Sequence, residues 1–239
     1  MLEFLFNNNN LITHSIQCIA AIIGIFNLKK YKNTIGSFFI GILIYISAVD
    51  LLAMYTYYCN TIPFLNFIAN TKFESNYWWY TIFFDCIAVL LFAIFFYKIV
   101  VKNKYKNVIK YSAFLYLIVF VYIIFSDLKH LFIGTYSVIY TAEAILIMIC
   151  TTTYFIEILE SNKVLYFSKS LYFYVSVTVF LWWLIVTPVV FFDKYFITED
   201  IHFIKLKRCI YIFANIFMYT TFSFGLIVST PDKNKKFIK

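Results

Sequence analysis

Residues 78–101 read WWYTIFFDCIAVLLFAIFFYKIVV and contain one acidic and one basic residue, Asp85 and Lys98. At about 1.5 Å per residue, a helix of this length crosses a hydrocarbon core of about 30 Å. Aromatic residues crowd its beginning, as is typical of a membrane–water boundary, and lysines crowd its end, as is typical of the cytoplasmic side. The stretch therefore predicts a transmembrane helix together with its direction.

The composition of the whole chain also indicates that lipid surrounds the protein. Of the 239 residues, 63% are hydrophobic and 13% are charged, and the mean hydropathy is +0.82. A soluble domain with so few charges could not cover its surface with polar groups. We therefore predict an all-α, polytopic membrane protein whose main partner is the lipid bilayer. Nucleic acid is not an expected partner, because no basic run interleaved with aromatic residues occurs in a soluble domain.

Seven apolar stretches are candidates for membrane-spanning helices. The expected helices cover about residues 11–26, 35–58, 78–101, 108–126, 137–159, 171–192 and 207–228. The first is short for a span and holds two polar residues, His14 and Gln17. The seven expected helices predict a single transmembrane domain over residues 1–230, followed by a basic cytoplasmic tail at residues 231–239.

The basic residues are unevenly divided between the two ends of the expected helices. The first, third and fifth connections with their flanks, together with the C-terminal tail, hold 14 of the 20 Lys and Arg residues. The positive-inside rule then places the N-terminus outside and the C-terminus inside. The chain begins without a basic segment or a small-residue cleavage site, so no cleaved signal peptide is expected.

Three carboxylates, Asp50, Asp85 and Glu143, fall within the expected spans. A charge at the centre of a membrane helix costs at least about 2.5–3.5 kcal/mol on insertion scales, so each of them needs a reason. They lie six to eight residues from the outer ends of three different helices. At about 1.5 Å per residue, all three are expected about 9–12 Å below the outer boundary.

Polar residues also recur along one face of the last helix. This stripe consists of Tyr211, Asn215, Tyr219 and Ser223. Such stripes face the interior of a bundle. We therefore predict an outward-facing polar cavity walled by the second, third, fifth and seventh helices, with Arg208 as counter-ion. The candidate ligand or ion residues are Asp50, Asp85, Glu143, Arg208, Asn215, Tyr211 and Tyr219. The alternative is that each acid hydrogen-bonds a neighbouring Tyr, Ser or Thr and only fixes the helix register.

The histidines raise the question of a metal site. His14, His130 and His202 fall on or near the expected outer side, and Asp127 could join them. Solvated histidines are the simpler interpretation, because the ligands would come from distant loops. The five cysteines show no CxxC or Cys/His spacing. We expect no cofactor.

The predicted topology resembles that of the microbial rhodopsins. Residues 178–192, TVFLWWLIVTPVVFF, are similar to the Trp-then-Pro helix that packs the retinal ring in that family, and Asp85 would match a counter-ion position. Residues 209–228 contain no lysine, however, so no Schiff base with retinal is expected. The seven-helix zinc hydrolases of the ceramidase and adiponectin-receptor type match poorly, because the last helix here has no His.

A second resemblance runs over nearly the whole chain. The segments NYWWYTIFFD (residues 76–85), TTTYFIEIL (151–159) and ANIFMYTTFSFGL (214–226) resemble small seven-helix membrane proteins of Bacteroidetes that carry no assigned activity. The resemblance implies the same architecture and a bacterial cytoplasmic (inner) membrane. It implies no activity.

Three functions remain open from the sequence. The chain shows no soluble domain, nucleotide motif or nucleophile–base pair, which favours a non-enzymatic sensor, receptor-like module or membrane partner. Its short inner loops leave room for a protein partner on the cytoplasmic face, and it could form oligomers. The alternative is a channel or carrier for protons or cations that uses the three acids. The second alternative is a lipid-modifying membrane enzyme that acts from the outer face.

Overall fold

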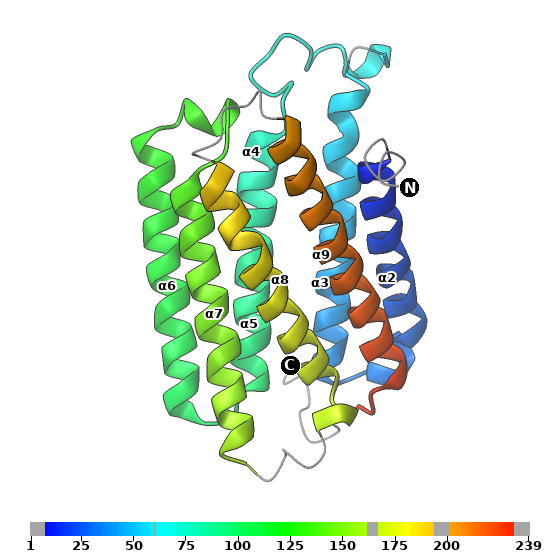
Figure 1. The fold of residues 1–239 in the computed structure, drawn as a ribbon, viewed down its shortest axis with the longest axis vertical. Helices are drawn as coiled ribbons and strands as arrows, with labels where there is room; N and C mark the ends of the chain where they lie inside the picture. The colour runs from blue at the N-terminus through cyan, green and yellow to red at the C-terminus, as the bar shows by residue number, and fades with distance from the viewer. Residues whose placement is uncertain (1–7, 60, 162–166, 194–200, 232–239) are drawn as a thin grey trace.

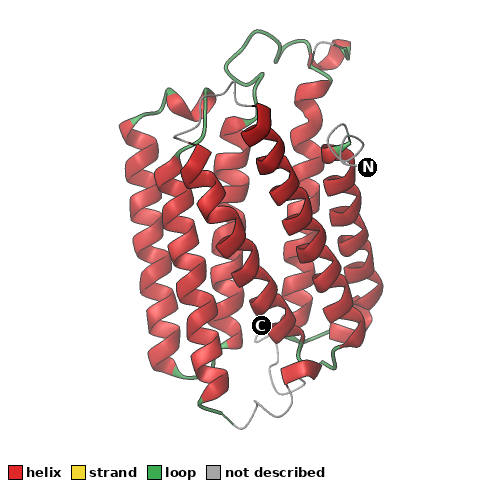
Figure 2. Cartoon of the chain, in the orientation of Figure 1, coloured by secondary structure: helices red, strands yellow, loops and turns green. Residues whose placement is uncertain are grey.

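The computed structural model describes residues 8–59, 61–161, 167–193 and 201–231, and the regular structure of this part is helical (Figure 2). Seven of its helices are long and apolar enough to cross a membrane. These candidate spans are Asn9–Tyr31, Ile35–Tyr57, Tyr77–Ile99, Asn103–Ser126, Ser137–Leu159, Leu171–Val190 and Phe203–Val228. The prediction of an all-α chain with seven apolar spans is confirmed, and it indicates a multi-pass membrane protein.

Most spans are single α-helices, but two have a composite backbone. The single helices are α2 (Asn9–Tyr31), α6 (Asn103–Ser126), α7 (Ser137–Leu159), α8 (Leu171–Asp193) and α9 (Ile201–Val228). The second span consists of α3 (Ile35–Ala53) and the 3₁₀ turn η1 (Met54–Tyr57). The third consists of α4 (Tyr77–Trp79), the π-helical segment η3 (Tyr80–Ala88) and α5 (Val89–Ile99). Two further 3₁₀ turns, η2 (Pro63–Leu65) and η4 (His130–Phe132), lie in the connections.

Six of the spans form a closed ring (Figure 1). Around it, α2 packs against α3, α3 against α5, α5 against α7, α7 against α8, α8 against α9, and α9 returns to α2. The remaining helix, α6, packs outside this ring against α5 and α7. We call the end of the bundle at which α2 begins the N-terminal end; the long connection between η1 and α4 lies there as well. The ring therefore has an axis that α6 does not reach.

Aromatic side chains fill this axis toward the opposite end of the bundle. The ring of Phe39 lies 5.7 Å from that of Phe95 and 5.0 Å from that of Phe222, between centroids. Tyr172 joins them, 6.0 Å from Phe95. All four side chains are buried, and aromatic pairs at these distances attract one another. We call Phe39, Phe95, Tyr172 and Phe222 the aromatic floor.

Several helices are longer than the hydropathy pattern predicts. Helix α2 covers residues 9–31 instead of the expected 11–26. The Asn27 side chain donates back to the Ile23 carbonyl (2.8 Å), and Lys30 Nζ donates to the Leu226 carbonyl at the end of α9 (2.9 Å). Polar residues thus extend α2 because they have partners there. Similarly, α6 begins at residue 103 instead of 108, and α9 at 201 instead of 207. Of the expected tail, residues 232–239 lie outside the described part.

The middle of the third span departs from α-helical geometry. Segment η3 is π-helical over nine residues. Such segments are rare in proteins, and those that occur are often found at functional sites. Two tyrosines from neighbouring helices donate to its carbonyls: Tyr116 of α6 to Asp85, and Tyr45 of α3 to Phe83 (3.0 Å). These bonds hold the segment in place between α3 and α6.

Candidate functional site

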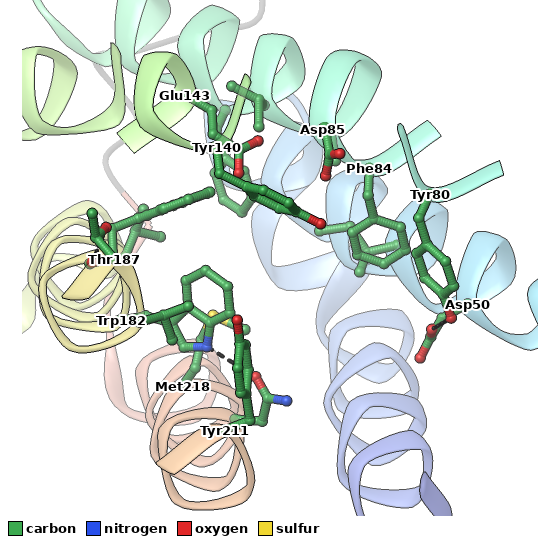
Figure 3. A pocket seen from close by; sticks show the side chains of 18 of the residues that line it. Asp50, Tyr80, Phe84, Asp85, Tyr140, Glu143, Trp182, Thr187, Tyr211 and Met218 are labelled. Atoms are coloured by element: carbon green, nitrogen blue, oxygen red, sulfur yellow. Dashed lines mark hydrogen bonds between the residues drawn. The ribbon is translucent and has the colours of Figure 1, made fainter. Parts of the chain in front are cut away.

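The helix ring encloses a central cavity of about 330 Å³ (Figure 3). Its size lies within the range of small-molecule sites, about 300–1,000 Å³. Its wall is mainly apolar, and residues of α2, α3, η3, α5, α7, α8 and α9 contribute to it. Phe222 of the aromatic floor is one of the lining residues, so the cavity ends against the floor.

The three predicted intramembrane acids all line this cavity. Asp50 comes from α3, Asp85 from η3 and Glu143 from α7. The residues are nearly enclosed, with exposed fractions of 7% for Asp50, 7% for Asp85 and 1% for Glu143. Tyr211, Asn215 and Tyr219 of α9 line the cavity too. Six of the seven predicted cavity residues therefore meet in one place, and α2 and α8 add walls that the sequence did not predict.

Arg208 does not join them. Its side chain is exposed, and it is not among the residues that line the central cavity. The basic partner of Asp50 is instead His14, whose Nδ1 lies 2.5 Å from Asp50 Oδ2. The predicted counter-ion role of Arg208 is thus replaced by a histidine of the first span, which packs directly against α3.

Asp50 has a second partner on its other oxygen. The Tyr80 hydroxyl donates to Asp50 Oδ1 over 2.9 Å. Figure 3 shows Tyr80 and Asp50 together at one side of the cavity. Asp50 therefore joins α2, α3 and η3 through its two carboxylate oxygens. For this acid, the alternative of a hydrogen-bonded structural role fits the geometry.

A second, more polar cavity of about 340 Å³ lies next to the first. Its lining includes Asn9 and Asn10 at the start of α2 and Tyr57 at the end of η1, so it lies at the N-terminal end. We call it the vestibule. Five residues line both cavities: Thr13, Asp50, Tyr80, Tyr211 and Asn215. The His14–Asp50–Tyr80 group thus lies at the junction between the polar vestibule and the mainly apolar central cavity, which we also call the chamber.

Asp85 and Glu143 differ from Asp50 in their surroundings. Within the described part of the chain, neither carboxyl group has a hydrogen-bond or ion-pair partner, whereas Asp50 has two. Figure 3 shows the two side chains along one wall, with the Tyr140 ring beside them. Gln17 also lines the cavity, and its Nε2 is buried without a hydrogen-bond partner among the described residues. Buried polar groups normally have partners, so these three are exceptions.

The opposite wall is built from α8 and α9. Trp182 Nε1 donates to Asn215 Oδ1 over 2.9 Å, and the Trp182 ring packs edge-on against Trp183 at 5.0 Å. Figure 3 shows Trp182, Met218 and Tyr211 across the cavity from the two unpartnered acids. The chamber therefore has a carboxyl side and an aromatic side.

The described histidines, His14 and His130, lie apart and have separate partners. Among the described residues, no group of three or more His, Cys, Asp or Glu side chains is arranged to hold a metal ion. His14 is bonded to Asp50. His130 Nε2 lies 3.1 Å from the Thr135 carbonyl, and Asp127 Oδ1 accepts a bond from the His130 backbone (3.2 Å). The side chain of His202 lies outside the described part.

Several lining residues were not predicted from the sequence. Gln17, Tyr80 and Trp182 contribute polar atoms to the cavity. No protein-family model, curated protein or solved structure matches the chain. The geometry of the cavity is therefore the basis for a functional proposal.

Proposed function

We propose that the chain is a non-enzymatic, receptor-like or sensor module that binds a small molecule in the central cavity. The observation that carries this proposal is an apolar chamber of about 330 Å³ that lies inside the helix ring and adjoins a polar vestibule at Asp50. Apolar walls with a few convergent polar groups are typical of small-molecule sites. A ligand would enter through the vestibule and come to rest beside Asp85 and Glu143.

The main alternative is conduction of protons or cations by the three acids. The aromatic floor favours binding over conduction, because the buried rings of Phe39, Phe95 and Phe222 close the axis beneath the chamber. A conducting path would need water or titratable groups through this layer. A lipid-modifying enzyme is supported less, since His14 is engaged with Asp50 and His130 with the connection between α6 and α7.

The setting of the proposed module is a bacterial inner membrane, with the vestibule open to the outside. The lysine distribution supports this direction. On the cytoplasmic face, the described connections at residues 32–34 and 100–102 are short, which leaves that face open to a protein partner. Such a partner would receive the signal of ligand binding.

A cavity-filling substitution tests the binding function. Purified full-length protein is titrated in detergent with three probes that share one body: 4-phenylbutylammonium, 4-phenylbutanol and 4-phenylbutanoate. We expect at least one probe to raise the midpoint of thermal unfolding in a saturable manner, because a ligand that binds only the folded state stabilises it. Met218→Trp fills the chamber and should abolish the rise. Phe217→Trp, at the exposed neighbouring position, should leave it unchanged.

The conduction alternative is tested in liposomes. Wild-type protein is reconstituted, and proton and K⁺ fluxes are measured under a pH gradient and a membrane potential. We expect no flux above protein-free liposomes. A flux that disappears in Asp85→Asn, together with no saturable shift by any probe, would replace the binding proposal with the conduction alternative.

A further inference from the structure

We propose that the ligand of the central cavity is a lipophilic organic cation, with its charged group beside Asp85 and Glu143 and its apolar body against the aromatic side of the chamber. This inference rests on the binding function proposed above and specifies the chemical class of the ligand.

The first ground is that the carboxyl groups of two buried acids have no partner among the described residues. Asp85 and Glu143 line the cavity with exposed fractions of 7% and 1%, and neither carboxyl group has a hydrogen-bond or ion-pair partner in the described part of the chain. A buried polar group without a partner costs free energy, and a buried charge costs more. The same wall thus holds two groups that a cationic donor would satisfy. Asp50 needs no such ligand, because His14 and Tyr80 occupy both of its oxygens.

The second ground is the lack of a compensating charge in the wall. Among the described residues that line the central cavity, three carry carboxyl groups and none is Lys, Arg or His. A cationic ligand would therefore bring a positive charge to a wall whose described residues include no base. An anion would find no basic partner among the described lining residues, and burying an unpaired negative charge in an apolar enclosure is costly.

The third ground is that aromatic rings lie on both sides of the chamber. Phe84 and Tyr140 flank the acids, and Trp182 faces them from α8 (Figure 3). Aromatic faces attract ammonium and guanidinium groups, and the attraction increases when the cation is desolvated. The same rings offer apolar contact to an alkyl or aryl body. The wall therefore suits a molecule that is both cationic and hydrophobic.

The same observations distinguish an organic cation from a metal ion. Ca²⁺ takes six to eight oxygen ligands, and Mg²⁺ requires near-octahedral oxygen coordination. The wall is mainly apolar, and no His, Cys, Asp or Glu group of three or more is arranged for a metal in the described residues. An organic cation needs fewer oxygen ligands because its body is stabilised by apolar contact.

The probe series of matched body and different charge tests this inference on the full-length protein. We expect 4-phenylbutylammonium to bind at least about tenfold more tightly than 4-phenylbutanol, and 4-phenylbutanoate to bind most weakly, because hydrogen bonds between charged groups are about twice as strong as neutral ones. Asp85→Asn and Glu143→Gln should each weaken ammonium binding by about tenfold, while alcohol binding changes by less than about twofold. Glu160→Gln, at the opposite end of α7, is the matched control and should change neither.

Each contrary result has a defined meaning. Equal or tighter binding of the alcohol or the carboxylate overturns the cation inference but leaves the binding function in place. So does a ratio between ammonium and alcohol that both amide variants preserve. The wild-type probe ratio stands without the variants, so it decides the question even if one of them fails to fold. No saturable binding by any of the three probes overturns both proposals.

Discussion

At the scale of single residues, the Asp50 carboxylate has a side-chain partner on each of its two oxygens. His14 Nδ1 lies 2.5 Å from one of its oxygens, and the Tyr80 hydroxyl donates to the other over 2.9 Å. The three residues come from α2, α3 and η3. Hydrogen bonds to a buried charged group contribute about 1.5–3 kcal/mol, more than neutral ones. Asp50 should therefore stabilise the junction between vestibule and chamber.

A double-mutant cycle measures this contribution. His14→Ala, Asp50→Ala and the double variant are unfolded in mild detergent, and their free energies of unfolding are compared with the wild type. We expect a coupling energy of about 1–3 kcal/mol, because the two side chains are in direct contact. Asn10→Ala is the control, since its bond to the Tyr57 hydroxyl (2.6 Å) is exposed. Additive effects of the two single substitutions would contradict the role of the pair.

At the scale of elements, the end of α7 holds the turn between α5 and α6. The carboxylate of Glu157 is buried and accepts the backbone N–H groups of Val101 and Lys102, each over 2.9 Å. One turn on, Glu160 is exposed and bonds Lys102 Nζ (2.5 Å) and the Tyr105 hydroxyl (2.7 Å). Glu157 in α7 and Glu160 directly after its end therefore fix the direction in which the chain leaves α5 and enters α6.

The bonds that Glu160 accepts from Lys102 and Tyr105 make the stability of this turn depend on pH. The hydrogen bond from Lys102, with that from Tyr105, lowers the pKa of Glu160 from its ordinary 4.5 to about 2. Because the pKa is lower in the folded state, the stabilisation is complete above about pH 4.5 and is lost as the pH falls toward 2. Thermal midpoints of the wild type and Glu160→Gln should thus differ by a small amount near neutral pH and converge in acid. A difference that stays constant down to about pH 2.5 would contradict this.

The local sequence predicts where the third span lies but not its backbone geometry. The span at residues 78–101 could be predicted because its apolar length and its flanking residues are local properties. Its π-helical middle could not, because the partners of the η3 carbonyls include Tyr45 and Tyr116 of other helices, which the local sequence does not reveal. Helix α6 begins at Asn103 and not at residue 108 as the sequence predicts, for a similar reason. Its first turn contains Lys104, a residue typical of a loop, whose Nζ lies 3.7 Å from Oε1 of Glu160 directly after α7.

At the scale of the whole molecule, periodicity located the acids but not their partners. Counting residues from the helix ends predicts a common depth for Asp50, Asp85 and Glu143, and the structure shows that the three line one cavity. The pairing of Asp50 with His14 instead of Arg208 depends on which helices are neighbours in the ring. A closed ring of six helices with α6 outside cannot be deduced from hydropathy alone, because each span is predicted from its own residues.

The direction of the bundle is the property on which the outward-binding proposal depends. The lysine distribution predicts that the ends of α2, α5 and α7 face the cytoplasm and that the vestibule faces outward. Alkaline phosphatase, which is active only outside the cytoplasm, should be active when inserted in the connection near residue 70. Green fluorescent protein, which folds in the cytoplasm, should fluoresce when fused after residue 239. The reverse pattern would turn the vestibule toward the cytoplasm. It would leave the cavity and its cation preference intact, but the ligand would then be an intracellular one.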